Sequence, residues 1–207
     1  MEDVLDLYEQ QYDPAQPVVC FDELAYQLVS ETRQPLPSKP GHAAIYDYEY
    51  RREGTCNMFM FFEPAAGWRH VEVSEQRTAK DFAAQMKALV DRYYPHAKRI
   101  RVVLDNLNTH TLGALYAAFE PAEARRIATK LEFHYTPKHG SWLNMVEIEL
   151  GVLARQCLKR RIASMEIVRQ EVEHWEEARN LAEESVQWRF TSSDARNKLT
   201  RLYPSVL

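Results

Sequence analysis

The pattern of hydrophobic and polar residues separates short strands from amphipathic helices along the chain. Two apolar runs of strand length each end in an acid. Val18 to Phe21 runs into Asp22, and the run that starts at Arg99 ends in Asp105. Reactive groups in α/β sheets gather at the carboxyl ends of strands. The pattern therefore places both carboxylates where such a fold would have its site.

Further strands are predicted between and after these acids. Turns at 52–54 and 63–67 separate three of them, so we expect these three to form an antiparallel meander. The predicted strands cover residues 45–51, with Tyr46, Tyr48 and Tyr50 on one face, and 55–62, 68–73 and 131–135. The order of segments predicts an α/β fold: a mixed sheet of three antiparallel strands plus parallel strands, flanked by helices.

Helical periodicity accounts for most of the remaining chain. Thr78 and Asp81 have the spacing of a capping box at the start of a helix that Pro95 ends. Ser164 opens a long charged helix, and Ser192 or Ser193 is expected to cap the last one. The other predicted helices cover 110–119, 121–130 and 141–161. The C-terminal helices are an addition to the sheet and the helices that flank it.

Composition narrows the class of protein. A chain of 207 residues fits one large domain or a domain with an appendage. A net charge of −4 argues only weakly against nucleic-acid binding, because a cluster of metal-binding acids lowers the count. No apolar run approaches the roughly 18 residues that cross a bilayer, and the start lacks a secretory signal. We expect no membrane association and a cytoplasmic location.

The chain is expected to fall into three parts. Residues 1–16 have the character of the end of an interdomain linker, which suggests a further domain upstream. Residues 17–162 hold the sheet and its helices, and residues 163–207 form a helical extension packed on that core.

A third acid joins the two strand-end aspartates. Glu147 and Glu149 both lie on the helix predicted over 141–161, roughly 160° apart around its axis, so only one of them faces the site. Periodicity does not choose between them. Three acids on three separate elements are what a divalent-metal site for phosphodiester chemistry needs. Taken singly, each acid is also explained as a turn former, a helix cap or a solvated residue.

Two longer motifs carry a family resemblance. Asp105-Asn-Leu-Asn-Thr-His110 and the stretch from Tyr135 to Asn144-Met-Val-Glu147 resemble the second and third catalytic blocks of DDE transposases, in the mariner superfamily and its bacterial "IS six-thirty" relatives. The segment ending in Asp22 resembles their first block. The resemblance implies an RNase H-like fold, with Asp22, Asp105 and Glu147 as catalytic residues and metal ligands. It favours Glu147 because Asn-Met-Val-Glu matches the family's Asn-Pro-Ile-Glu.

The resemblance also implies a function. We expect a transposase catalytic domain that cleaves and transfers DNA strands with two Mg²⁺ ions, for which Mn²⁺ substitutes. It would act on double-stranded DNA, at transposon ends and target, as a homodimer. When bound to DNA it would be associated with the bacterial nucleoid. The alternatives are a stand-alone RNase H-like nuclease, recognisable by its substrate preference, and an inactive DNA-binding remnant, recognisable by the loss of metal binding.

Several other residues are candidates for supporting roles. Asn106, His110 and Asn144 would orient the acids or contact a phosphate, although a turn residue and a helix-start residue explain Asn106 and His110 equally well. Basic and polar residues near the third acid are candidates for DNA contact, against the alternative of solvated surface. They are Lys138, His139, Ser141, Arg155, Lys159, Arg160 and Arg161.

Overall fold

The centre of the molecule is a five-stranded mixed sheet, seen in a computed structural model that describes residues 1–203. The strands are Val18–Glu31 (β1), Tyr50–Glu63 (β2), Trp68–Ser74 (β3), Ile100–Leu104 (β4) and Leu131–Tyr135 (β5). Their order across the sheet is β3-β2-β1-β4-β5. β1, β2 and β3 pair antiparallel, β4 pairs parallel with β1, and β5 pairs parallel with β4. The predicted α/β fold with a mixed sheet is confirmed.

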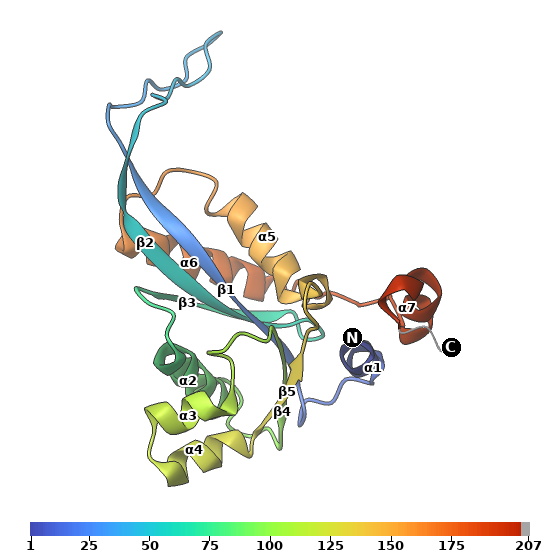
Figure 1. Cartoon of the computed structure of the whole chain (residues 1–207). Helices are drawn as coiled ribbons and strands as arrows, with labels where there is room; N and C mark the ends of the chain where they lie inside the picture. The colour runs from blue at the N-terminus through green and yellow to red at the C-terminus, as the bar shows by residue number, and fades with distance from the viewer. Residues whose placement is uncertain (204–207) are drawn as a thin grey trace.

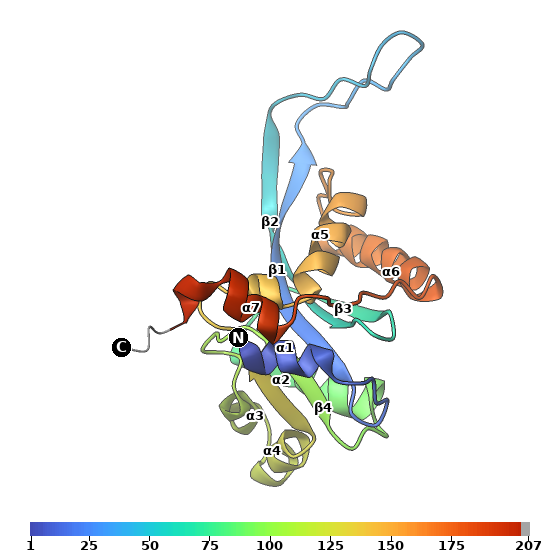
Figure 2. The same ribbon diagram turned by 90° about the vertical axis from the view of Figure 1, so that its right-hand side faces the viewer.

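β1 and β2 form a long hairpin whose far end projects beyond the rest of the molecule (Figure 1, Figure 2). The predicted strand at 45–51 and turn at 52–54 are wrong, because the two strands are joined by the loop 32–49. Gly54 lies inside β2 with a φ of +105°, next to a shift in the register of β1 with β2. Glycine suits such a bulge because it adopts positive φ without strain. The third antiparallel strand, beside β2 and β3, is therefore β1 and not the segment 45–51.

Helices cover both faces of the sheet (Figure 1). One face packs on a core centred on Phe21 and Phe61, and the other on a core that includes Cys20 and Met60. Neighbouring strand residues thus serve opposite layers. The first layer holds α2 (Ala79–Ala88), η1 (Leu89–Tyr93), α3 (Leu112–Ala118) and α4 (Pro121–Ala128), and the second holds η2 (Ser141–Leu143), α5 (Val146–Gln156) and α6 (Met165–Leu181). Within residues 1–203, no helix combines the length and the apolar character needed to span a bilayer.

Capping residues explain where several helices begin. Thr78 and Asp81 make both halves of the predicted capping box at the start of α2. The Ser164 hydroxyl accepts the bond that caps α6, as predicted. The last helix, α7 (Ser192–Lys198), is capped by Thr191 and not by either predicted serine, and a single turn, η3 (Thr200–Leu202), follows it. Thr191 is the cap because Asp194, three residues later, completes a capping box with it.

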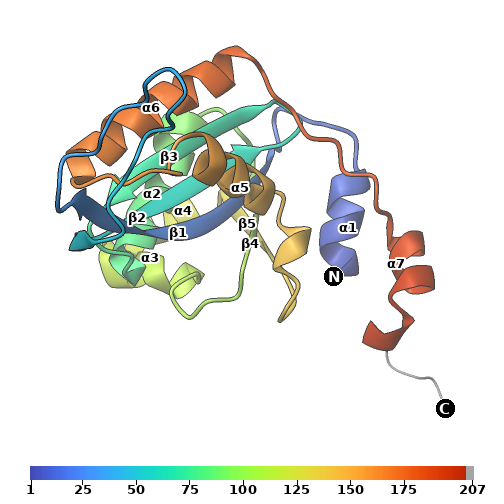
Figure 3. The same cartoon turned by 90° about the horizontal axis from the view of Figure 1, so that it is seen from above.

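The first helix packs against the last one (Figure 3). α1 (Glu2–Glu9) buries Val4 and Leu5 in the core on the α5 side of the sheet. Arg196 of α7 pairs with Glu2 at 2.7 Å, and the Ser192 amide donates to the Glu9 carboxylate. Residues from the two ends of the described chain therefore form one helix pair at the side of the sheet.

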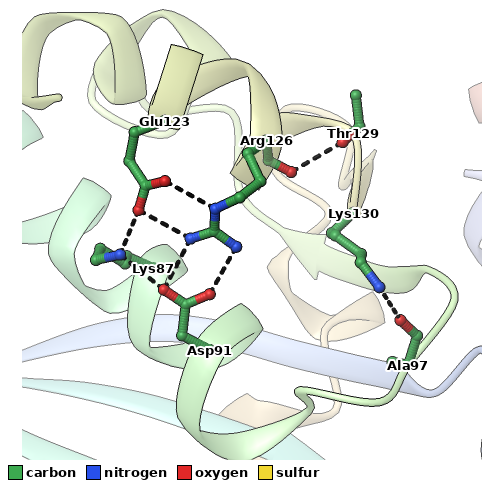
Figure 4. Close-up of polar contacts among 7 residues, drawn as sticks. All are labelled: Lys87, Asp91, Ala97, Glu123, Arg126, Thr129 and Lys130. Carbon is green, nitrogen blue, oxygen red and sulfur yellow. Dashed lines mark hydrogen bonds and ion pairs between the residues drawn. The ribbon is translucent and has the colours of Figure 1, made fainter. Parts of the chain in front are cut away.

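An ion-pair network holds α4 against α2 and η1 (Figure 4). Arg126 makes two bonds with Asp91, at 2.8 and 2.9 Å, and also pairs with Glu123 at 2.7 Å. Lys87 contacts both acids from α2. All four side chains are partly exposed, so the network adds only modest stability, but its bidentate geometry fixes the orientation of α4.

Candidate active site

The register of two central strands brings the two strand-associated aspartates together. Val18 pairs with Arg101 and Cys20 with Val103 in the parallel ladder of β1 and β4. Continued by two residues, this register puts Asp22 level with Asp105. β4 ends at Leu104, one residue before Asp105, whereas β1 runs on beside β2. Asp22 is thus inside a strand, not at its end as predicted, but it lies where its neighbour β4 stops.

The helix α5 contributes the third acid. Glu147 in its first turn is exposed, whereas Glu149 is buried. Glu149 lies in an ion-pair cluster with the buried Arg69, at 3.0 Å, and with Arg179, at 2.9 Å. The two glutamates therefore point in different directions, as their spacing requires. The predicted helix over 141–161 is shorter in the structure, because Asn144 adopts an extended conformation and the α-helix ends at Gln156.

One pocket of about 370 Å³ is lined by all three predicted acids. Asp22 and Asp105 enter it from the sheet, and Glu147 enters from α5. Its lining also includes Glu23, Ser141, Leu150, Gly151 and Ala154. Among the residues of the described chain, no three metal-binding side chains lie close enough together to ligate an ion in this arrangement. The three carboxylates line the same pocket but do not converge on one ion position.

His110 connects Asp105 to a second acid. Its Nδ1 lies 2.5 Å from Asp105 Oδ1 and its Nε2 lies 2.9 Å from Glu23 Oε1. The imidazole is fully buried and stacks on Phe82. Burial alone lowers the pKa of His110, but the bonds to and charges of Asp105 and Glu23 outweigh it and raise the pKa to about 9. His110 is therefore an imidazolium at neutral pH that donates to both acids.

Glu23 was not among the predicted site residues. Its side chain is only 3% exposed, and Arg77 lies 3.9 Å away. The signal was present in the sequence, because Glu23 directly follows Asp22 after an apolar run. A glutamate buried there needs a charged partner, which His110 supplies.

The pKa of Asp22 is raised mainly by burial. Burial, together with the charges of Asp105 and Glu147, raises this pKa to about 7, against the opposing effect of a bond from the Glu23 amide. That amide donates to Asp22 Oδ1 at 2.7 Å. A cation between these carboxylates would favour the charged form of Asp22 against both effects.

The turn before α5 is held against β1 beside Asp22. Asn144 is buried, and its Nδ2 donates to the Phe21 carbonyl at 2.8 Å. Gly140 begins the turn with its amide bonded to the Pro137 carbonyl. A Cβ at Gly140 would come within 2.7 Å of the Pro137 ring, so the close approach needs glycine. Asn144 thus ties the turn before α5 to β1, whereas Asn106 lies exposed in the turn after β4.

The candidates for DNA contact separate into two groups. Lys138, His139 and Ser141 are exposed in the turn at the pocket, and Ser141 lines it. Arg155 is exposed on α5, and its Nη1 is 3.3 Å from where a Cβ on Gly151, a pocket-lining residue, would lie.

The second group lies beyond the end of α5. Lys159 is exposed and lies outside α5, although the predicted helix over 141–161 included it, because the helix ends at Gln156. Arg160 pairs with Glu171 at 2.5 Å. Arg161 contacts Glu31 and donates to the Asp47 carbonyl at 2.8 Å. It therefore ties the loop of the β1–β2 hairpin to the core.

Comparison with known proteins decides the family. The family model described as DDE superfamily endonuclease matches residues 17–169. The chain belongs to the DDE superfamily endonucleases. This confirms the family predicted from the three blocks. No curated protein matches the chain in sequence.

A solved structure has the same fold as this DDE endonuclease. The Mos1 mariner paired-end complex with Mn matches with a TM-score of 0.51 and 19% identity, covering 84% of this chain and 52% of that one. The Mos1 strand transfer complex matches at 18% identity and a TM-score of 0.49, covering 84% and 51%. The DDE chain thus spans about half the length of the Mos1 protein. The predicted RNase H-like fold class is confirmed.

Proposed function

We propose that the chain is the catalytic domain of a transposase that cleaves and transfers DNA strands, with Asp22, Asp105 and Glu147 as its catalytic acids. The observation that carries the proposal is the single pocket these acids line, although they come from three elements far apart in the chain. Membership in the DDE endonucleases supports it, as does a fold shared with a transposase solved in paired-end and strand transfer complexes.

The donor set fits a hard divalent cation. Carboxylate oxygens are the ligands that Mg²⁺ takes, with water and phosphate oxygens in its remaining positions, and the raised pKa of Asp22 marks a place where added positive charge is favourable. Asp22, Asp105 and Glu147 would hold two Mg²⁺ ions, or Mn²⁺ in their place. When bound, such ions activate the attacking oxygen and stabilise the leaving one.

The chain's own residues orient this set and its substrate. His110 fixes one oxygen of Asp105 and neutralises Glu23 behind it, and Asn144 holds the turn that leads into Glu147. We propose that the exposed cations at the pocket, Lys138 and Arg155, contact the phosphates of double-stranded DNA. Lys159, Arg160 and Arg161 would extend this contact along the duplex.

The wider assembly is part of the same proposal. We infer a homodimer that acts on paired transposon ends, as expected for strand transfer at two ends. The core at 17–162 would carry the chemistry, with the helices that follow it as an extension packed on the core.

A nicking assay tests the proposal. The chain is incubated with supercoiled plasmid in Mg²⁺ or Mn²⁺, and strand cleavage is followed on a gel. We expect metal-dependent nicking that Asp105→Asn abolishes and that Glu120→Gln, an exposed acid on the turn into α4, leaves unchanged. Equal nicking by Asp105→Asn and the parent chain would overturn the proposal. Preferential cleavage of an RNA–DNA hybrid would instead indicate the stand-alone nuclease.

A further inference from the structure

An aromatic cluster lies beside the wall of the carboxylate pocket. Trp142 belongs to η2, directly after the pocket-lining Ser141. Its partners, Trp188 and Phe190, come from the extended connection between α6 and α7. The ring centroids of Trp142 and Trp188 are 6.2 Å apart with planes at 22°, and Phe190 meets Trp142 edge-on at 5.8 Å. Trp142 is nevertheless 43% exposed.

Contacts with Tyr8 of α1 hold the aromatic cluster in place. Trp188 donates from Nε1 to the Phe190 carbonyl at 2.7 Å, and the Tyr8 ring packs on it at 5.3 Å. The Tyr8 hydroxyl in turn donates to the Leu143 carbonyl at 2.9 Å, next to Trp142 in the turn. Helix α1, the C-terminal connection and the pocket turn are thus tied together. An aromatic ring fixed in this way loses little entropy when a ligand stacks on it.

Basic residues are neighbours of the cluster in sequence or in contact with it. Lys138 and His139 precede Trp142 in the turn, and Arg189 stands between its two aromatic partners; all three are exposed. Lys198 of α7 lies over the Phe190 ring with its Nζ 5.6 Å from the centroid. Aromatic side chains among cations are the combination that binds single-stranded nucleic acid, because every base offers a face for stacking.

The packing of the three rings differs in a way that points to a ligand. Trp188 and Phe190 pack against the apolar core on the α5 side of the sheet, so structural demand explains them. Trp142 is instead among the exposed large apolar residues. Core packing therefore explains the positions of Trp188 and Phe190 but not the exposed ring of Trp142.

We propose that Trp142, backed by Trp188 and Phe190, is a stacking site for an unpaired base of the DNA strand that enters the carboxylate pocket. This rests on the proposed DNA cleavage function and adds a preference within it. A base inside a duplex does not reach a side chain without leaving its stack. The chain should therefore favour DNA that is unpaired beside the point of cleavage, and Trp142 acts as a positioning residue.

Binding without cleavage tests the proposal separately from the nuclease activity. In EDTA, fluorescence anisotropy compares a blunt duplex with the same duplex carrying a short unpaired end. The parent chain should prefer the unpaired end by about tenfold, on the scale of one stacked base. Trp142→Leu, which keeps apolar contact with Trp188 but offers no aromatic face, should lose that preference, and Trp142→Phe should keep most of it. Tyr116→Ala, an exposed aromatic on α3, should behave as the parent.

Two results would overturn the inference. One is an unchanged preference in Trp142→Leu; the other is an equal loss in Trp142→Phe and Trp142→Leu, which would indicate a packing role. Because the assay contains no metal, a chain that fails to nick plasmid but keeps a Trp142-dependent preference contradicts only the proposed function. A chain that nicks but shows no such preference contradicts only the stacking site.

Discussion

The two glutamates of α5 offer a matched pair of substitutions with opposite expected effects. Glu149→Gln removes the anion that compensates Arg69, whose side chain is fully buried. Glu147→Gln removes one of the acids that crowd Asp22, at an exposed position of the same helix. The two changes are chemically identical and two residues apart, so a difference between them reports only on their surroundings.

The structure sets the size of the first effect. Glu149 forms an ion pair with Arg69 at 3.0 Å and accepts two hydrogen bonds from Arg179, at 2.9 and 3.0 Å. Removing one partner of a buried ion pair costs about 3–5 kcal/mol, because it leaves a buried charge uncompensated. Glutamine keeps one carbonyl acceptor, which favours the lower end, about 3 kcal/mol. For a chain of this size that corresponds to a fall in Tm of roughly 6–12 °C.

Glu147→Gln should change stability by less than about 0.5 kcal/mol, as exposed substitutions do, but should abolish metal-dependent nicking. Thermal unfolding by far-UV circular dichroism and plasmid nicking well below Tm measure the two properties on the same samples. Glu149→Gln should melt early and still nick. If Glu149→Gln instead melted with the parent chain and failed to nick, the orientation of α5 described above would be refuted.

Three further predictions follow from the site. His110→Gln should lower Mn²⁺ affinity or nicking by about 10- to 100-fold, the usual effect of losing a residue that orients a ligand, here Asp105, and full activity would count against the His110 contact. Asp22→Asn should raise the Tm of the metal-free chain at pH 8 but not at pH 4. Because the pKa of Asp22 is raised in the folded state, the contribution of this group to stability is fully present only below its unfolded-state pKa near 3.9. That contribution is lost as the pH rises through about 7. Equal Tm shifts at both pH values would contradict the prediction. Gly140→Ala should destabilise by about 1–3 kcal/mol, since its Cβ meets Pro137, and an unchanged urea midpoint would argue against that turn.

Much of the fold was predictable because short-range signals were strong. Alternation and apolar runs placed β3, β4 and β5, and the spacing of Thr78 and Asp81 placed α2. The β1–β2 hairpin was not predictable in the same way. Glycine at position 54 has the same sequence signature in a turn as in a bulge, and only pairing along the whole of β1 distinguishes them.

The three acids that line the pocket were predictable, but Glu23 and the contacts among the pocket residues were not. The motifs named Asp22, Asp105 and Glu147, and the structure places them around one pocket. The motif favoured Glu147 over Glu149, but periodicity does not reveal why Glu149 is buried: its partner Arg69 lies 80 residues away in sequence. The contact of Glu23 with His110 likewise depends on how β1 lies beside β4.

The most direct test of the central claim is calorimetric titration of Mn²⁺ into the chain near pH 8. If the three acids form one metal site, the parent chain should bind Mn²⁺ saturably, and Asp22→Asn, Asp105→Asn and Glu147→Gln should each weaken binding by about tenfold or more. Binding that none of the three substitutions changes would contradict the account.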